Sequence, residues 1–437
     1  MTEIAAAVES VIARVLDDFT GGTGDGVVVD SPPGAGKSTL VVRAATQIAQ
    51  AQQPVMVVAQ TNQQVDDLVD RMARAAPGTR IGRLSAGDYV RTPQVAHSNV
   101  VVAEKVSGLA DTPIVVATAA KWVYVADGPW RWAIVDEAYQ MRSDMLLRVA
   151  PRFERAMFVG DPGQLDPFST IDIDRWAGLT WDPMQSAVAA MLRNNPDIPV
   201  HLLPVSWRLS AQAVPPVSSA FYPFTGFGAA TTADQRQLTF QTRGFGGPVD
   251  DTIEVAARTG WALHQLPARH TLRTDTEAVH AIASITARLL ERGAVAWSER
   301  TPDGAPVTAD RIAVGAAHRD QVAAIRHALA ARGIDGVRTD TANRLQGSEY
   351  DVVVVLHPLS GRRDATAFHL ESGRLCVLTS RHRHACIVVA RTGIQELLDA
   401  HPPGEPTHLG VPAKFPDGWE ANQAMLTHLQ SHHISAV

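Results

Sequence analysis

The octapeptide at residues 31–38, Ser-Pro-Pro-Gly-Ala-Gly-Lys-Ser, restricts the fold of this chain more than any other segment. It lies between an apolar run at 27–30, which is typical of a buried strand, and a helical pattern at 38–51. Glycines in such a loop let backbone N–H groups turn inward, and the first turn of the helix adds partial positive charge, so the loop can bind phosphate. This order of elements predicts a nucleotide-binding α/β domain. A Gly-Pro turn with a capping serine is the alternative interpretation.

The lysine of this loop is unusual for the chain, because only four of the 39 basic residues are lysines. We expect Lys37 to reach the β- and γ-phosphates of ATP as a compact positive charge, and the Ser38 hydroxyl to bind Mg²⁺. The residues that we predict to contact the nucleotide around this loop are Pro33, Gly34, Ala35, Gly36, Lys37, Ser38 and Thr39.

Short apolar runs alternate with helical patterns along most of the chain, which is typical of parallel sheets covered by helices on both faces. The segment 222–251 lacks clear periodicity and is expected to be a loop or a small insertion. We predict an α/β protein with two domains, at 1–198 and 199–400, and a surface tail at 401–437. The predicted strands cover 27–30, 55–59, 114–117, 132–136 and 156–160, and then 201–205, 261–266, 312–315, 352–357, 375–378 and 386–390.

Composition narrows the class of protein. The chain has 437 residues, of which 45% are hydrophobic and 19% charged, as in ordinary globular proteins. No tract approaches the ~20 apolar residues that cross a bilayer, and the N-terminus lacks a signal-peptide pattern, so we expect a cytoplasmic protein. Two cysteines are too few for a cysteine zinc site or a disulfide framework. The net charge of −6 argues against a basic coat, so contact with nucleic acid would need a local groove.

A pair of carboxylates follows the fourth apolar run, with Asp136 at its end and Glu137 next. Because ligands bind at the carboxyl ends of strands in a doubly wound sheet, both acids are expected beside the phosphate-binding loop. We expect Asp136 to hold Mg²⁺ through water and Glu137 to deprotonate the attacking water. An ordinary acidic surface turn is the alternative.

The order of the motifs resembles that of superfamily 1 helicases. These motifs are the loop at 31–38, Asp-Glu-Ala-Tyr-Gln at 136–140 and Gly-Asp-Pro-Gly-Gln-Leu at 160–165. The chain is most similar to the 1B branch, which contains the nonsense-mediated-decay RNA helicase and its DNA-acting relatives. The resemblance covers roughly residues 26–391. It implies two tandem RecA-like P-loop NTPase domains with parallel sheets and reduced accessory insertions, with Mg·ATP bound between the domains.

The resemblance also implies catalytic residues outside the loop. Gln164 would sense the γ-phosphate, and Arg208 and Arg381 would be arginine fingers that reach the phosphate when the domains close. Two guanidinium groups suit this role, because the transferring phosphoryl group spreads negative charge over its oxygens. For Arg374 and Arg383 in the last motif, a surface salt bridge is an equally good interpretation.

The resemblance implies that three further residues contact the nucleotide. Trp207, where the family has tyrosine, would stack on the base, and Gly347 and Glu349 would approach the phosphates and the ribose. The family reads adenine with a glutamine upstream of the phosphate loop, but the first glutamine here is Gln47, after the loop. The preference for ATP over other nucleotides is therefore open.

Four polar residues match the family's nucleic-acid contacts, and the resemblance implies that they position a single strand through its phosphates without reading sequence. For Thr61 and Thr118 helix capping is the alternative, and the two roles can coexist. The four residues are Thr61, Asn62, Thr118 and Thr341.

These features predict an ATP-dependent translocase or helicase on single-stranded nucleic acid, moving 5′ to 3′ by family resemblance, with DNA favoured over RNA. Short spacings between motifs leave little room for accessory domains, which favours translocation over unwinding. One alternative is an NTPase switch that recruits an unidentified protein partner without productive unwinding. Another is a P-loop nucleotide kinase, against which the arginine fingers on a second domain argue.

Overall fold

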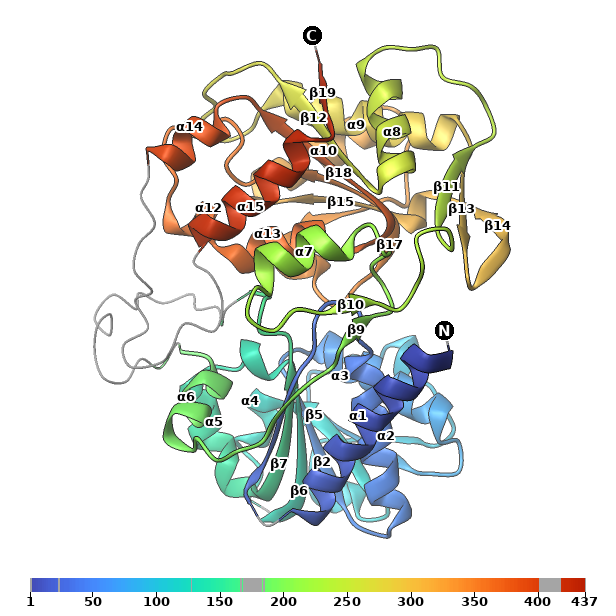
Figure 1. Cartoon of the computed structure of the whole chain (residues 1–437). Helices are drawn as coiled ribbons and strands as arrows, with labels where there is room; N and C mark the ends of the chain where they lie inside the picture. The colour runs from blue at the N-terminus through green and yellow to red at the C-terminus, as the bar shows by residue number, and fades with distance from the viewer. Residues whose placement is uncertain are drawn as a thin grey trace.

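The computed structural model describes residues 2–22, 24–126, 128–165, 167, 183, 185–400 and 418–436. In these residues the chain forms two α/β units, which lie one above the other in Figure 1. Each unit is built on one large parallel sheet with helices on both faces. The predicted α/β fold with tandem RecA-like domains is therefore confirmed.

The first unit holds an eight-stranded sheet in which every pairing is parallel. Its strands are β1 (Gly26–Asp30), β2 (Val55–Ala59), β3 (Ile81–Leu84), β4 (Val100–Ala103), β5 (Ile114–Thr118), β6 (Trp130–Asp136), β7 (Phe153–Gly160) and β8 (Val200–Leu202). The spatial order is β4-β3-β5-β2-β6-β7-β1-β8. Only β7 lies between β1, which leads into the phosphate loop, and β6, which ends in the acidic pair. The topology therefore brings these two motifs to one edge of the sheet.

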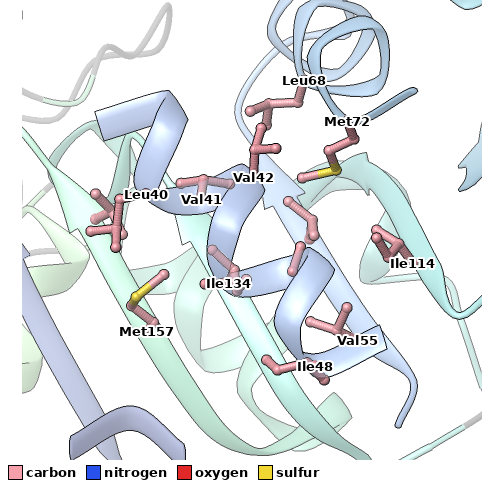
Figure 2. Close-up of a cluster of buried hydrophobic side chains, with 14 of the residues drawn as sticks. Leu40, Val41, Val42, Ile48, Val55, Leu68, Met72, Ile114, Ile134 and Met157 are labelled. Carbon is pink, nitrogen blue, oxygen red and sulfur yellow. The ribbon is translucent and has the colours of Figure 1, made fainter. Parts of the chain in front are cut away.

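Helices cover both faces of this sheet. One face carries α1 (Thr2–Gly21), α2 (Lys37–Gln50) and α3 (Asn62–Ala75), and the other carries α4 (Ala119–Trp122), α5 (Ser143–Val149) and α6 (Ala187–Asn194). Because successive strand residues point to opposite faces, Val27 packs in one core and Val28 in the other. Figure 2 shows Leu40 and Ile48 of α2 against Ile134 and Met157 of the sheet. None of the described helices is both long and apolar enough to cross a membrane.

The second unit holds a six-stranded parallel sheet in the order β16-β15-β17-β18-β12-β19. The strands are β12 (Trp261–Leu266), β15 (Ile312–Ala316), β16 (Arg338–Thr341), β17 (Tyr350–Leu356), β18 (His382–Arg391) and β19 (His433–Ser435). One face carries α8 (Pro248–Thr259), α9 (Thr276–Glu291) and α10 (Arg319–Ala330). The other carries α7 (Val214–Phe221), α13 (Ser372–Thr379), α14 (Ile394–Asp399) and α15 (Gly418–Gln430).

A small antiparallel sheet extends the second unit. It has the order β11-β13-β14 and consists of β11 (Gln237–Phe240), β13 (Ala294–Ser298) and β14 (Thr301–Pro306). The segment 222–251, expected to be a loop or a small insertion, supplies β10 (Gly228–Ala229), β11 and the first turn of α8. The short β10 pairs with β9 (Val205–Ser206) of the chain that leaves the first unit.

The strand predicted at 375–378 is wrong, because these residues lie in helix α13, which is buried from Gly373 to Thr379. A short run of apolar residues suits a helix that is buried all round as well as it suits a central strand, so periodicity could not separate the two.

The ends of the predicted domains differ from the structure in two places. Strand β8 lies at 200–202, beyond the expected boundary at 198, and pairs with β1 of the first sheet. The expected surface tail begins with 401–417, which lie outside the described residues, but α15 buries Met425 and Leu429 in the second core. Strand β19 then pairs with β12. The end of the chain is thus part of the second unit.

Candidate nucleotide-binding site

The phosphate loop joins β1 directly to α2. Gly34 and Gly36 have φ angles of 73° and 94°, a left-handed conformation that glycine adopts without steric cost. Gly36 caps α2 without a side-chain acceptor, which leaves the first N–H groups of the helix available to an anion. Ser38 and Thr39 lie in this first turn. The loop thus has the backbone that phosphate binding requires.

Lys37 lies among three acids at the carboxyl edge of the first sheet. Its ammonium group forms an ion pair with Glu137 Oε1, and both side chains are largely buried. Burial opposes the charge of Lys37, but Glu137, Asp136 and Asp161 outweigh it, so the pKa of Lys37 is raised. The structure therefore brings the lysine of the loop and the acidic pair together, as expected.

Asp136 and Ser38 suit a Mg²⁺ ion. Burial raises the pKa of Asp136 to about 6, although Lys37 opposes the shift, and its Oδ1 atom is buried without a hydrogen-bond partner. A bound cation would satisfy this oxygen, and a hydroxyl with one carboxylate matches the hard oxygen ligands that Mg²⁺ takes while it keeps several waters. Among the described residues, no cluster of three or more His, Cys, Asp or Glu side chains offers another metal site.

Glu137 has an uncommon backbone conformation, with φ 51° and ψ 44°. Non-glycine residues adopt this left-handed conformation rarely, and it is often found at functional sites. Gln140 Nε2 donates to Glu137 Oε2 at 3.0 Å, while the other carboxylate oxygen accepts from Lys37. Both oxygens are therefore held in place beside the phosphate loop.

Gln164 connects the two units. Its amide nitrogen donates to Asp161, and its Oε1 accepts from Gln346 Nε2 of the second unit at 2.9 Å. Asp161 also accepts from the Tyr222 hydroxyl, with 2.5 Å between the oxygens. Burial raises the pKa of Asp161 although these hydrogen bonds oppose the shift. A group that bound Gln164 would thus act on contacts of both units.

Arg208 and Arg381 are buried near one another between the units. The Arg208 Nη1 atom donates to Ser380 O at 3.3 Å, and its Nε atom lies 3.5 Å from Glu349 Oε2. Burial, with repulsion from Arg381, lowers the pKa of Arg208 to about 10. Arg381 has no carboxylate within ion-pair distance among the described residues; its guanidinium donates to Val377 O and Ser380 Oγ. This pair of charges suits an anionic ligand.

The two residues before Arg208 form hydrogen bonds with the backbone of the phosphate loop. The Trp207 N–H donates to Gly34 O at 2.8 Å, and the Ser206 hydroxyl donates to Pro33 O at 2.6 Å. A side chain at Gly34 would place its Cβ 2.3 Å from the Arg208 Cβ. Trp207 packs against the first core and lies beside Gly36, so its ring borders the loop. That this ring stacks on the base stays a prediction.

The contact between Gly34 and Arg208 predicts a large effect of Gly34→Ala. A new Cβ must overlap the Arg208 Cβ, in addition to the strain of a positive φ, and we expect the free energy of unfolding to fall by about 2–4 kcal/mol. Gly36→Ala is the matched control, because its φ is also positive but its nearest contact, Trp207 Cδ1, is 4.0 Å away. It should cost only about 1 kcal/mol. Urea unfolding of both variants measures the difference, and equal stabilities would contradict the close packing.

Glu349 lies among arginines. It accepts from Arg383 Nη1 at 3.2 Å, and Arg300 is 3.8 Å away, in addition to its contact with Arg208. Burial opposes ionisation, but Arg208 and Arg383 outweigh it, so the pKa of Glu349 is lowered. Gly347, with a φ of 80°, is exposed in the same turn.

The remaining arginines of the last motif form salt bridges, but both arginines are buried rather than at the surface, where the alternative interpretation put them. Arg383 pairs with Glu349 and Glu299, and Arg374 pairs with Glu371 and lies over the Phe368 ring.

The expected nucleic-acid residues lie at carboxyl ends of strands in both sheets. Thr61 follows β2, and Thr118 is the last residue of β5, which pairs with β2. The two threonines cap α3 and α4 by accepting from Gln64 N and Lys121 N. The capping role of both threonines is therefore present. Asn62 Oδ1 accepts from the buried Arg83 at 2.9 Å.

In the second unit, Thr341 precedes the short helix α11 (Ala342–Leu345), and its side chain makes no capping hydrogen bond. The structure thus groups the first three candidates at one sheet and places the fourth at the other.

Sequence reasoning missed several contacts around the site. Gln60 Nε2 donates to the backbone oxygen of Asp136 at 3.2 Å, and Tyr222 binds Asp161. Arg236 donates to the backbone oxygens of Trp207 and Arg208. Gln60 directly follows a strand, which is a usable signal, whereas Tyr222 and Arg236 lie in a stretch without periodicity.

Comparisons with known proteins give two domain matches. Family models, each described as an AAA domain, match residues 13–172 and 185–393. No curated protein matches the chain.

Solved structures with similarity to the chain include viral helicases. The PRRSV helicase is 16% identical with a TM-score of 0.44, and the match covers 89% of this chain and 56% of that one. Arterivirus nonstructural protein 10 (helicase) is 14% identical with a TM-score of 0.45, covering 93% and 63%. The complex of that arterivirus protein with DNA is 14% identical with a TM-score of 0.44, covering 90% and 64%. The chain thus spans less than two thirds of these helicase chains.

Proposed function

We propose that this chain, whose two halves match models of AAA domains, is a superfamily 1 helicase that hydrolyses Mg·ATP between its two domains to move along single-stranded nucleic acid. The observation that carries this proposal is the position of Arg208. Its Cβ lies against Gly34 of the phosphate loop, and its guanidinium donates to Ser380 of the second unit. A triphosphate on the loop would therefore meet positive charge from both domains.

The chemistry of the proposed reaction rests on charges already gathered at the loop. When bound by Ser38 and Asp136, Mg²⁺ would neutralise charge on the phosphate oxygens. The phosphates compete with Glu137 for Lys37, which frees the Glu137 carboxylate to accept the proton of the attacking water. Arg208 and Arg381 stabilise the charge that develops on the transferred phosphoryl group. Each of these groups holds or moves charge at a site that water reaches poorly.

Coupling of hydrolysis to movement is proposed to run through Gln164. This side chain joins Asp161 of the first unit to Gln346 of the second. If Gln164 binds the γ-phosphate, loss of that phosphate changes a contact between the domains. Helix α11 joins Gln346, at its C-terminal end, to Thr341, a proposed nucleic-acid contact at its N-terminal end, so the change can reach the bound strand.

The proposed strand contacts are Thr61, Asn62, Thr118 and Thr341. Their hydroxyl and amide groups, together with nearby N–H groups, would bind backbone phosphates without reading bases. This mode of binding needs no basic exterior, in agreement with the net charge of −6. We propose DNA rather than RNA as the strand, and family resemblance implies movement from 5′ to 3′.

An ATPase assay with matched single-stranded DNA and RNA of the same sequence and length tests the proposal. We expect single-stranded DNA to raise the rate of hydrolysis by about tenfold or more, because bound strand and closed domains favour one another. RNA should stimulate less. The Lys37→Ala variant, assayed in parallel, controls for a contaminating ATPase.

Three outcomes would change the proposal. If neither nucleic acid stimulates hydrolysis, the motor is rejected in favour of an NTPase switch that recruits a partner. If RNA stimulates more than DNA, the preference for DNA is wrong. If the purified wild-type chain hydrolyses no nucleotide with or without a strand, the enzymatic proposal itself fails.

A further inference from the structure

Arg208 belongs to a ring of alternating positive and negative side chains at the edge of the small sheet. Arg236, just before β11, pairs with Glu299 in the turn between β13 and β14. Glu299 pairs with Arg383 of β18, Arg383 pairs with Glu349, and Glu349 returns to Arg208. The ring thus joins five elements that are far apart in the sequence.

Arg236 holds the backbone on both sides of Arg208. Its Nη2 atom donates to Trp207 O at 2.7 Å, and its Nη1 atom donates to Arg208 O. These two oxygens belong to the peptide planes that flank the Arg208 Cα. When both planes are held, the direction of the Cα–Cβ bond of Arg208 is determined. The Trp207 N–H, which donates to Gly34 O, ties the same residues to the phosphate loop.

Glu299 orients Arg236 for this task. Its two carboxylate oxygens accept from Arg236 Nε at 3.1 Å and Nη2 at 2.9 Å, a bidentate pair that aligns the guanidinium plane. The Arg236 side chain is only 1% exposed, so its charge would be costly without this partner. Arg383 Nη2 donates to the same Glu299 at 3.2 Å.

Glu349 restrains the side chain of Arg208 from the opposite side of the ring. Its contact with Arg208 Nε, at 3.5 Å, is longer than its hydrogen bond of 3.2 Å with Arg383. A bound phosphate could therefore replace Glu349 as the partner of the Arg208 guanidinium, while the Glu349 carboxylate stays paired with Arg383. The main chain of Arg208 remains held by Arg236 throughout.

We propose that Arg236 and Glu299 are positioning residues that aim the Arg208 guanidinium at the nucleotide phosphates. They act from the small sheet, which supplies no residue to the predicted nucleotide site. This inference rests on the proposed function, in which Arg208 stabilises the transferring phosphoryl group. It adds that turnover depends on the turn between β13 and β14, so a ligand that moved this turn would alter the rate of hydrolysis.

The test compares steady-state ATP hydrolysis by the wild-type chain and four variants, Arg236→Ala, Glu299→Gln, Arg208→Ala and the double variant Arg208→Ala/Arg236→Ala. Arg236→Ala should lower kcat by about 10- to 100-fold, because a small misplacement of a catalytic group has effects of this size, while KM for ATP changes little. Glu299→Gln, which preserves shape but removes the charge, should lower kcat in the same direction. The double variant should be no slower than Arg208→Ala alone, since Arg236 acts through Arg208.

Arg292→Ala is the matched control. Arg292 is also a buried arginine of the second unit that pairs with two acids, Asp250 and Glu254, and donates to a backbone oxygen, Thr242 O. It makes no contact with Arg208 or the phosphate loop. It should alter the melting temperature without changing kcat by more than about twofold.

The outcomes separate the inference from the proposed function. If Arg208→Ala itself keeps the wild-type kcat, the assignment of the arginine finger fails. If Arg208→Ala is slow but Arg236→Ala and Glu299→Gln keep the wild-type kcat, or if the losses multiply in the double variant, the positioning inference is overturned. Should Arg236→Ala fold poorly, Glu299→Gln decides the question.

Discussion

Lys37→Ala is expected to reduce ATP hydrolysis by about 10³-fold or more, because the ammonium group is the positive charge of the loop that neutralises the β- and γ-phosphates. The structure adds a second reason. Lys37 is the positive charge that acts most strongly on Asp136, and it pairs with Glu137, so its loss leaves buried carboxylates without their cation. Steady-state hydrolysis and equilibrium binding of a fluorescent ATP analogue measure the two effects.

Stability is the second readout for this variant. Breaking a largely buried ion pair by removing one partner costs about 3–5 kcal/mol, and protonation of Asp136 offsets part of that cost. Lys105→Ala is the control, since Lys105 is another of the four lysines but is exposed. It should leave hydrolysis and unfolding unchanged. Hydrolysis by Lys37→Ala at the wild-type rate would remove the loop from the proposed mechanism.

Glu137→Gln is expected to bind ATP as the wild type does and to hydrolyse it about 10²- to 10⁴-fold more slowly, which is the usual contribution of a general base. The amide oxygen can still accept from Lys37, and the Gln140 amide can rotate to meet the new NH₂ group, so the site should keep its shape. Single-turnover hydrolysis with the enzyme in excess isolates the chemical step from product release.

The matched control for this variant is Glu104→Gln, at an exposed glutamate of the same unit. It should keep both binding and turnover. Loss of nucleotide binding by Glu137→Gln would mean that the carboxylate mainly holds Lys37 in place, and full turnover would show that another group takes the proton.

The parallel sheets were predictable because their strands are locally encoded. The runs at 55–59 and 261–266 match β2 and β12 residue for residue, since short, mostly apolar runs between turn signals are typical of strands buried on both faces. The strands β3 and β4, at one side of the first sheet, were missed because each has only four residues. The prediction of a strand at 375–378 failed for a different reason. Helix α13 is buried from Gly373 to Thr379, so it has no exposed polar face that would reveal its helical period.

The phosphate loop and the acidic pair depend on few residues that lie next to one another or at the ends of strands, so the sequence could predict that Lys37 and Glu137 meet. Its prediction of arginines for the phosphate rested on the order of motifs alone. The contacts of these arginines could not be predicted from the sequence, because Glu349 and Arg383 become neighbours of Arg208 only when the second sheet forms.

The sequence by itself therefore determined the class of fold, the loop and its acids, because strand patterns and a loop of eight residues are local properties. Only the tertiary structure decided how Arg208 is held, how Tyr222 and Gln346 reach the Asp161 and Gln164 pair, and that the end of the chain completes the second sheet. These contacts join residues far apart in the chain. Their partners are chosen by packing and by the need to pair buried charges, which no stretch of sequence expresses alone.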